Sequence, residues 1–408
     1  MNSPTGNLWR HRPFLHYFGS RSLSEFAYQI AAVAVGWQIY SLTHSAFDLG
    51  LAGLAQFLPS ALLVLPAGHV ADRHARNRVV LACSTMEALA AAFLAWSTYT
   101  GHVTVGAIYG ALVIFGIASA FDSPASAALL PAVTSEEQLQ RGTALSTGAW
   151  QFAAITGPAV GGLLFAVAPV APYVVMFALS LSSAVLIGTM KMRVLQRANE
   201  SSTVGTLFAG VNFVLHNSAI LGTISLDLFA VLLGGATALL PIYAGDILHT
   251  GPWGLGVLRG VPSLGALAMT AVLARRAITQ GAGLKMFQAV IVFGLATVVF
   301  GVSRNLWISL VALAVMGAAD TVSVVIRSSL VQLATPDPMR GRVSAVNYLF
   351  INASNQLGAF ESGATAALLG AVPAVVVGGI GTIAVALLWM KLFPTLRRVE
   401  RLDGALVP

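Results

Sequence analysis

The sequence predicts an all-α integral membrane protein whose twelve transmembrane helices form two six-helix pseudo-symmetric bundles. Three observations lead to this prediction: an apolar composition, twelve long apolar runs, and a repeat between the two halves. Hydrophobic residues make up 57% of the 408 residues, charged residues make up 9%, and the mean hydropathy is +0.81. Ordinary globular proteins contain roughly 25% charged residues. This chain therefore has too few charges to cover a soluble surface of its size.

Twelve apolar runs follow one another along the chain, each long enough to cross a bilayer as a helix. They span residues 14–42, 46–71, 78–100, 104–130, 142–168, 171–191, 218–245, 254–274, 283–301, 305–333, 343–370 and 372–392. Prolines such as Pro59 and Pro262 are compatible with membrane helices, because neighbouring helices satisfy the backbone groups that proline frees. The runs lack the ten-residue alternation that is typical of a membrane β-barrel.

Positive charges predict the orientation of these spans. With twelve spans, both termini and every second connection share one side, and that side holds all but three of the 22 Lys and Arg residues. The exceptions are Arg304 on the opposite side, Arg259 near a helix end and Arg327 inside a span. The positive-inside rule then places both termini in the cytoplasm, in a bacterial-type inner (plasma) membrane. The same rule accounts for the net charge of +7, so we expect no nucleic-acid partner.

The longest and most polar connection divides the chain into two sets of six spans. We predict an N-terminal bundle over residues 1–191, a cytoplasmic linker over 192–217, and a C-terminal bundle with a cytoplasmic tail over 218–408. Within the linker, apolar residues recur at three- and four-residue spacing from Val204 to Leu215. This spacing indicates an amphipathic helix at the membrane surface. A tightly packed internal loop is the alternative.

The two halves match each other at an offset of about 198 residues. Asp122 corresponds to Asp320, and Arg141 corresponds to Arg340 within one residue. Repeats related by an axis along the membrane normal are a known transporter architecture, in which the substrate binds near the midplane.

The connection after the second span carries a motif of small and charged residues. It reads Gly68-His69-Val70-Ala71-Asp72-Arg73-His74-Ala75-Arg76-Asn77-Arg78. It resembles the motif that the major facilitator superfamily carries between helices two and three, with Ala75 in place of Gly and Asn77 in place of a basic residue. The resemblance implies a latch that closes the cytoplasmic face in the outward-open state.

In this latch, Gly68 permits close helix contact, and Asp72 faces the positive N-terminus of a helix from the other half. Arg73 and Arg76 make charge-assisted hydrogen bonds to carboxylates, and we expect Asp122 to be one of their partners. The alternatives are that the arginines only fix the topology, and that Asp122 carries a proton or caps a helix.

The fifth span contains Gly157-Pro158-Ala159-Val160-Gly161-Gly162. This segment resembles the core of a motif typical of antiporters in the same superfamily. The small residues Gly157, Gly161 and Gly162 let two helices touch through their backbones, and Pro158 bends the helix. The resemblance favours export over uptake, although small-residue packing without directional meaning is common.

Two further segments, 38–45 and 340–343, resemble the enterobactin-exporter and drug-efflux branch of the superfamily. This resemblance implies proton-driven efflux of a small, partly apolar molecule by alternating access. We expect the protein to work as a monomer, to use no cofactor, and to draw its energy from the proton gradient.

Six acidic residues lie within the predicted spans: Glu25, Glu87, Asp122, Asp227, Asp320 and Glu361. A charge in hydrocarbon costs at least a few kcal/mol, so each of these residues should face a cavity, a partner or the interface. A carboxyl group removed from water can also become neutral by binding a proton, as a proton antiporter requires.

Spacing along the helices suggests how these charges pair. Arg21 and Glu25 are four residues apart on the first span and can pair on one face. Glu25 is the first candidate for binding a proton or cation, and a local ion pair is the alternative. Asp320 and Arg327, seven residues apart, form a possible second network in the other half.

Asp227 and Glu361 are candidates for contact with cargo or protons, because the superfamily fold places their spans at or near the central cavity. We rank Glu87 lower, because the third helix of this fold is usually peripheral.

The sequence contains no zinc-protease motif, cysteine pair or phosphate-binding loop, and no nucleophile with a matching base. We therefore predict a transporter and not an enzyme. The alternatives are an importer or a lysophospholipid-type flippase on the same fold and, more remotely, a non-transporting membrane receptor.

Overall fold

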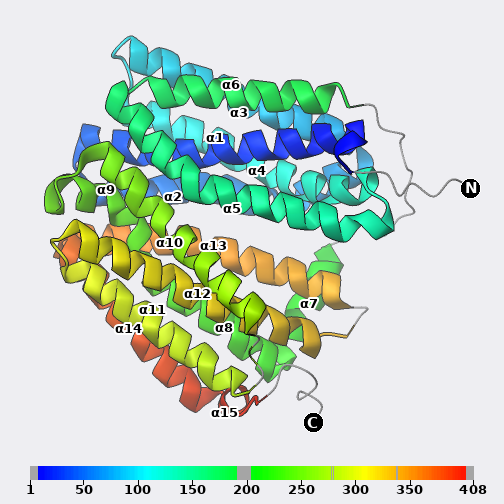
Figure 1. Cartoon of the computed structure of the whole chain (residues 1–408), viewed down its shortest axis with the longest axis vertical. Helices are drawn as coiled ribbons and strands as arrows, with labels where there is room; N and C mark the ends of the chain where they lie inside the picture. The colour runs from blue at the N-terminus through cyan, green and yellow to red at the C-terminus, as the bar shows by residue number, and fades with distance from the viewer. Residues whose placement is uncertain (1–7, 191–203, 277, 279, 337–338, 401–408) are drawn as a thin grey trace, which may run out of the picture. The chain divides into compact units, whose positions relative to one another are not determined.

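The computed structural model describes residues 8–190, 204–276, 278, 280–336 and 339–400, and nearly all of them are helical (Figure 1). The first long helices are α1 (Arg12–Thr43), α2 (Ala46–Arg73), α3 (Arg76–Tyr99), α4 (Val105–Val133), α5 (Glu136–Val167) and α6 (Ala171–Gly188). They are followed by α7 (Val204–His216), α8 (Ser218–Leu233), α10 (Gly251–Arg275), α11 (Ala282–Val302), α12 (Leu306–Ala334), α13 (Arg340–Leu369) and α14 (Ala371–Leu392). The short elements are η1 (Leu8–Arg10), η2 (Ala236–Leu239), α9 (Leu240–Ile242), the π-helix η3 (Tyr243–Ile247) and α15 (Pro394–Arg397).

The prediction of an all-helical membrane protein is confirmed. Within the described residues, ten helical segments are long and apolar enough to cross a membrane. The helices α1 and α13 have comparable lengths of 32 and 30 residues but are more polar. The linker helix corresponds to α7, whereas residues 192–203 and 401–408 lie outside the described part of the chain.

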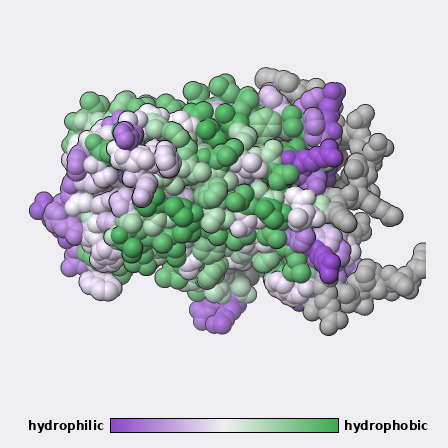
Figure 2. Space-filling model, turned by 90° about the horizontal axis from the view of Figure 1, so that it is seen from above, coloured by the Kyte–Doolittle hydropathy of each residue, from purple (hydrophilic) through white to green (hydrophobic). Residues whose placement is uncertain are grey.

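The surface of the protein suits a lipid environment. Leu62, Leu89, Trp96 and Leu368 are each more than 60% exposed. Figure 2 shows broad areas of hydrophobic residues on the viewed face, interrupted by patches of hydrophilic residues. Such a surface belongs in contact with acyl chains, because large contiguous apolar patches are rare on soluble monomers.

Polar residues mark where several helices begin. The side chain of Thr104 accepts a hydrogen bond from the backbone N–H of Ala107 at the start of α4. Asn217 and Asn305 cap α8 and α12 in the same way. These caps satisfy N–H groups that have no partner inside the helix. Helix α5 begins at Glu136, whereas the apolar run predicted from the sequence begins only at residue 142.

The chain divides into two compact units. Unit 1 comprises residues 1–38 and 58–202, and unit 2 comprises residues 39–57 and 203–408. The stretch 39–57, which contains the end of α1 and the beginning of α2, therefore packs within unit 2. There a Cβ on Gly50 would meet the Cα of Gly363 on α13 at 3.1 Å. The domain boundaries expected from the sequence, near 191 and 218, take no account of this stretch and stay a prediction.

Each unit has its own apolar core. In unit 1, α3 packs against α4 and α6, and the core includes the fully buried side chains of Phe14, Leu129 and Ile187. In unit 2, α11 packs against α12 and α14, around residues such as Phe287 and Ile326. These cores hold the helices that carry the charged groups described below.

The seventh apolar run is not one continuous helix. It breaks after α8, at Gly234 and Gly235, and continues as η2, α9 and η3. A Cβ on Gly235 would lie only 2.6 Å from the carbonyl oxygen of Gly358 on α13. The two glycines therefore let this segment approach α13 closely, a role that the apolar pattern of residues 218–245 does not indicate.

Candidate functional site

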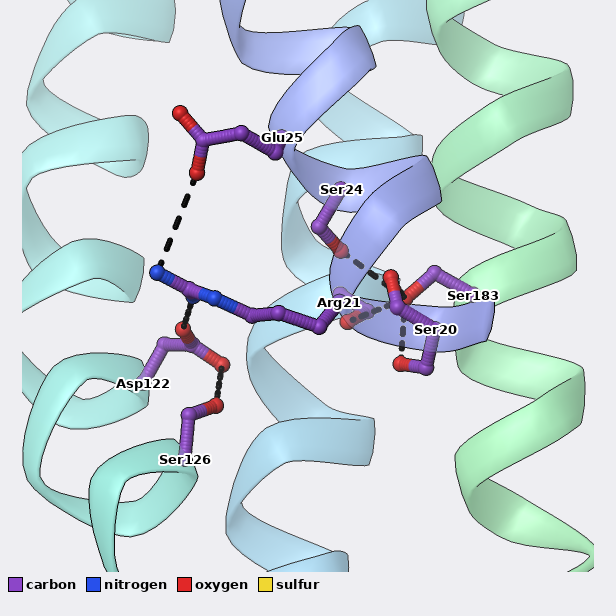
Figure 3. Close-up of polar contacts among 8 residues, drawn as sticks. Ser20, Arg21, Ser24, Glu25, Asp122, Ser126 and Ser183 are labelled. Atoms are coloured by element: carbon purple, nitrogen blue, oxygen red, sulfur yellow. Dashed lines mark hydrogen bonds and ion pairs between the residues drawn. The ribbon is translucent and has the colours of Figure 1, made fainter. Parts of the chain in front are cut away.

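A charged cluster in unit 1 joins α1 to α4 (Figure 3). An Nη1 atom of Arg21 donates to Oδ2 of Asp122 at 3.1 Å, and the other terminal nitrogen lies 3.8 Å from Oε2 of Glu25. Ser126, one turn beyond Asp122, donates its hydroxyl to Oδ1 at 3.0 Å. We call Arg21, Glu25, Glu87 and Asp122 the unit 1 charge cluster.

The carboxylates of the unit 1 charge cluster are more buried than its guanidinium. The side chains of Glu25 and Asp122 are 12% and 20% exposed, whereas that of Arg21 is 40% exposed. Gln29, one turn after Glu25, donates its amide to Oε1 of Glu25 at 3.3 Å. The Arg21–Glu25 pair expected from the spacing is thus present, and it extends through Gln29 on one face of α1.

Glu87 brings a third carboxyl group to this cluster from α3. Its electrostatic neighbours are Asp122, Arg21 and Glu25. The sequence prediction ranks Glu87 below the other acidic residues, because the third helix is expected to be peripheral. The ion pairs of Arg21 are with Glu25 and Asp122, and in their ionised forms the three carboxylates and the one guanidinium of the cluster leave an excess of two negative charges.

A group of serine hydroxyls fixes the same part of α1 against α6. The Oγ atom of Ser183 lies 2.7 Å from that of Ser20 and 2.8 Å from that of Ser24, and it also donates to the carbonyl of Ser20 at 3.1 Å. Ser84 of α3 is the next neighbour of Ser183, at 3.5 Å. Ser20 and Ser24 flank Arg21 on α1, so this serine hub helps to hold the arginine in place. Sequence reasoning missed the hub, because single serines in apolar runs carry no pairing signal.

The glycine motif of α5 packs against α1. A Cβ on Gly157 would lie 2.6 Å from Cβ of Gln29, and one on Gly161 would lie 3.0 Å from the carbonyl oxygen of Ile30. Pro158 lies inside the unbroken helix α5, and Gly162 is buried. The motif therefore sets the position of Gln29, which holds Glu25.

The predicted latch residues lie at the end of α2 and the beginning of α3. Arg73 is exposed and Gly68 is half-buried, while the side chain of Asp72 lies outside the described part of the structure. Arg76 donates from Nη1 to the carbonyl of Ala128 on α4 at 3.0 Å. Asp122, expected as a partner of these arginines, pairs with Arg21 here. The latch stays a prediction.

Unit 2 contains a second charged network, which we call the unit 2 charge network: Asp227, Asp320 and Arg327. Arg327 of α12 forms an ion pair with Asp227 of α8. The same guanidinium lies 3.7 Å from Oδ1 of Asp320. Asp227 and Arg327 are 9% and 8% exposed, whereas the side chain of Asp320 is 48% exposed. The spacing of Asp320 and Arg327 indicated their pairing, but not that Asp227 would be the closer partner.

Two further acidic residues of unit 2, Glu361 and Asp246, make hydrogen bonds outside the charge network. Glu361 on α13 accepts a hydrogen bond from its neighbour Thr365 at 2.8 Å. Within unit 2, the hydroxyl of Tyr40 donates to the carboxylate of Asp246 in η3, a contact that the sequence did not indicate. Among the residues that the structure describes, no group of three or more His, Cys, Asp or Glu side chains is arranged to hold a metal ion.

Comparisons with known proteins agree with this architecture. A family model described as "Transmembrane secretion effector" matches residues 9–405. The enterobactin exporter EntS of Citrobacter koseri is 26% identical over 399 residues, covering 96% of this chain and 94% of that protein. EntS of Escherichia coli O1:K1 is 25% identical over 397 residues, with the same coverage.

Solved transporter structures share the fold of the chain. A mutant of the nucleoside transporter NupG superposes with a TM-score of 0.75 at 14% identity, covering 93% of this chain and all of that one. A bacterial homologue of the human lysosomal transporter Spinster superposes with a TM-score of 0.73 at 11% identity, covering 95% and 96%. The expected major facilitator fold is therefore confirmed.

Proposed function

The chain belongs to the transmembrane secretion effector family of major facilitator transporters, and we propose that it is a proton-coupled exporter of a small amphipathic molecule. It is a multi-pass membrane transporter and not an enzyme. We further propose that both termini lie in the cytoplasm, in an inner (plasma) membrane, as the distribution of its positive charges indicates.

The unit 1 charge cluster carries the proposal of proton coupling. Its three carboxyl groups and one guanidinium come from α1, α3 and α4. A net charge of −2 in a low-dielectric bundle is costly unless partners or cations compensate it. Proton binding to two of these carboxyl groups removes that charge, and proton release restores it.

The energy available from protons matches what alternating access requires. Inverting a two-state equilibrium from 1:99 to 99:1 needs about 5.5 kcal/mol of differential binding. Each proton that crosses a potential of 100 mV releases about 2.3 kcal/mol. Two protons, the number that neutralises the unit 1 charge cluster, therefore supply free energy of the required order.

The proposed cargo follows from the relatives. The matched relatives include enterobactin exporters, so we propose a siderophore-like or drug-like molecule of mixed polarity. Cells that express the chain should accumulate less of the cargo when a panel of dyes, macrolides and catecholates is screened. Higher accumulation would instead favour an importer, and movement of lysophospholipid alone would favour a flippase.

Transport by the purified chain in liposomes with an imposed pH difference tests the coupling. We expect cargo movement that a protonophore abolishes. Asp122→Asn and Glu25→Gln should reduce the pH-driven rate at least tenfold. Glu137→Gln is the matched control, because Glu137 is an exposed carboxyl at the start of α5. Movement of cargo that is unaffected by the protonophore would refute proton coupling.

A further inference from the structure

The segment that follows α14 folds back against the beginning of α11 (Figure 1). The backbone N–H of Gly283 donates to the carbonyl of Val399 at 3.0 Å, and a Cβ on Gly283 would overlap the carbonyl oxygen of Leu396. Leu396 and Val399 are buried in the core of unit 2. Residues 394–400 therefore hold a fixed position against α11, and we call them the C-terminal strap.

This arrangement gathers four basic side chains at one end of unit 2. Arg397 and Arg398 belong to the C-terminal strap, and Lys391 lies in the last turn of α14. Lys285 lies in the first turn of α11, the helix against which the strap packs. We call these four residues, all of them exposed, the C-terminal basic patch.

The charge of the C-terminal basic patch is not balanced by the protein. In the part of the chain that the structure describes, no ion pair involves any of its four residues. Glu400, which is exposed, is the acidic residue of the C-terminal strap. Its one negative charge against four positive charges leaves an excess of three positive charges, which an anionic partner can neutralise.

Aromatic side chains mark the level of the membrane interface beside the patch. The ring of Trp389 on α14 lies 5.3 Å from that of Phe229 on α8 and 6.2 Å from that of Phe393, between ring centroids. The indole N–H of Trp389 donates to Oγ of Ser225 at 3.0 Å. Tryptophan is enriched where acyl chains meet headgroups, because its ring is apolar while its N–H is polar. Lys391 and the C-terminal strap follow Trp389 in the chain, so we expect them at the level of the headgroups.

The surface of α14 that leads to the patch is apolar. Leu387, Leu388 and Leu392 are 50%, 49% and 58% exposed. Exposed leucines and unbalanced basic side chains therefore meet at the end of α14. A lipid with an anionic headgroup fits both, because its acyl chains cover the leucines and its phosphate meets the guanidinium groups. A free phosphate would meet the charges alone.

We propose that the C-terminal basic patch binds the phosphate headgroup of an anionic phospholipid, with Arg397 and Arg398 as its principal contacts. Guanidinium groups pair with phosphate through two parallel hydrogen bonds. Clusters of basic residues at the cytoplasmic surface of a membrane attract anionic lipids, in agreement with the orientation proposed above. The site goes beyond export and depends neither on proton coupling nor on the direction of transport.

Native mass spectrometry of the purified full chain in detergent tests the proposal by counting bound lipids. Dioleoyl phosphatidylglycerol is titrated against phosphatidylcholine with the same acyl chains and against soluble glycerol phosphate. We expect the first phosphatidylglycerol to bind at least about tenfold more tightly than phosphatidylcholine. Equal affinities for the two lipids would overturn the proposal. If glycerol phosphate binds as tightly as phosphatidylglycerol, the site takes a free phosphate and the assignment of a lipid is wrong.

Paired substitutions localise the binding. Each basic residue at an anionic surface strengthens binding about fivefold, so Arg397→Gln/Arg398→Gln should weaken the affinity for phosphatidylglycerol about 25-fold. Arg78→Gln/Arg141→Gln is the matched control, because it removes the same charge from two exposed arginines of unit 1, and it should bind as the wild type does. Equal weakening in the two double variants would show a diffuse attraction and would refute the site.

Gly283→Ala separates the position of the patch from its charge. This variant keeps every charge, but its Cβ displaces the C-terminal strap at Leu396, so it should bind phosphatidylglycerol several-fold more weakly. Wild-type affinity would contradict a site that depends on the fixed strap. Thermal unfolding without lipid checks that each variant is folded, and Arg397→Lys/Arg398→Lys should bind more tightly than the glutamine pair. If Gly283→Ala does not fold, the arginine pairs decide the question.

Discussion

The contact between α5 and α1 gives a quantitative prediction for Gly157→Ala. The new Cβ would lie 2.6 Å from Cβ of Gln29, whereas carbon atoms pack best at about 3.5–4.0 Å. The helices must therefore move apart by roughly 1 Å. Forcing extra atoms into a packed interface costs about 1–3 kcal/mol.

Helix propensity acts in the opposite direction, because alanine favours a helix over glycine by about 1 kcal/mol. Gly148 provides the matched control: it lies on the same helix, and its Cβ would meet nothing within 4 Å. The propensity gain is common to both substitutions, so it cancels in their difference. We expect Gly157→Ala to be less stable than Gly148→Ala by about 1–3 kcal/mol.

Unfolding of the purified variants in detergent, by heat or by a denaturing detergent, measures this difference. Transport in liposomes adds a second measurement. Displacing Gln29 disturbs the amide that holds Glu25, so Gly157→Ala should also lower the rate driven by a pH difference. If the two alanine variants are equally stable, the close packing of α5 against α1 does not require glycine at position 157, and the argument is refuted.

Three further substitutions should change the stability of the purified chain, each measured by the same unfolding assay. Asp227→Asn leaves the buried guanidinium of Arg327 without its close partner, so we expect a loss of about 3–5 kcal/mol. The double variant Asp227→Asn/Arg327→Met should lose less stability than Asp227→Asn alone. If the stability losses of the two single variants simply add up in the double variant, the buried ion pair is contradicted. Ser183→Ala should cost about 1–3 kcal/mol because the buried serine hub loses its centre, whereas exposed Ser182→Ala should cost almost nothing. Gly235→Ala should cost about 1–3 kcal/mol through its contact with α13. If this variant melts at the same temperature as the wild type, α13 can move aside to make room for the added methyl group.

The sequence predicts helices well in this chain because long apolar runs have few alternatives in a membrane. The pairing of Arg21 with Glu25 is also predictable, because residues four apart share a helix face. The partner of Asp122 cannot be predicted in this way. Asp122 lies 101 positions from Arg21 in the chain, and only the packing of α1 against α4 brings the two together.

Similar reasons explain the other omissions. Glu87 joins the unit 1 charge cluster because α3 packs on α4, which no local pattern reveals. The break of the seventh apolar run depends on a contact between Gly235 and Gly358 of α13. An apolar run that contains two glycines reads as one continuous membrane helix until that neighbour is known.

The hydroxyls around Ser183 differ from the ionic contacts beside them in one respect. A hydroxyl both donates and accepts, so the hydroxyl–hydroxyl bonds of Ser183 with Ser20 and Ser24 can reverse direction when the two hydroxyls rotate together, whereas the bond to the carbonyl of Ser20 cannot. A guanidinium only donates, and an ionised carboxylate only accepts. Because Glu25 shares α1 with Arg21 while Asp122 lies on α4, a turn of α1 about its axis would alter the Arg21–Asp122 contact and leave the Arg21–Glu25 pair within its own helix.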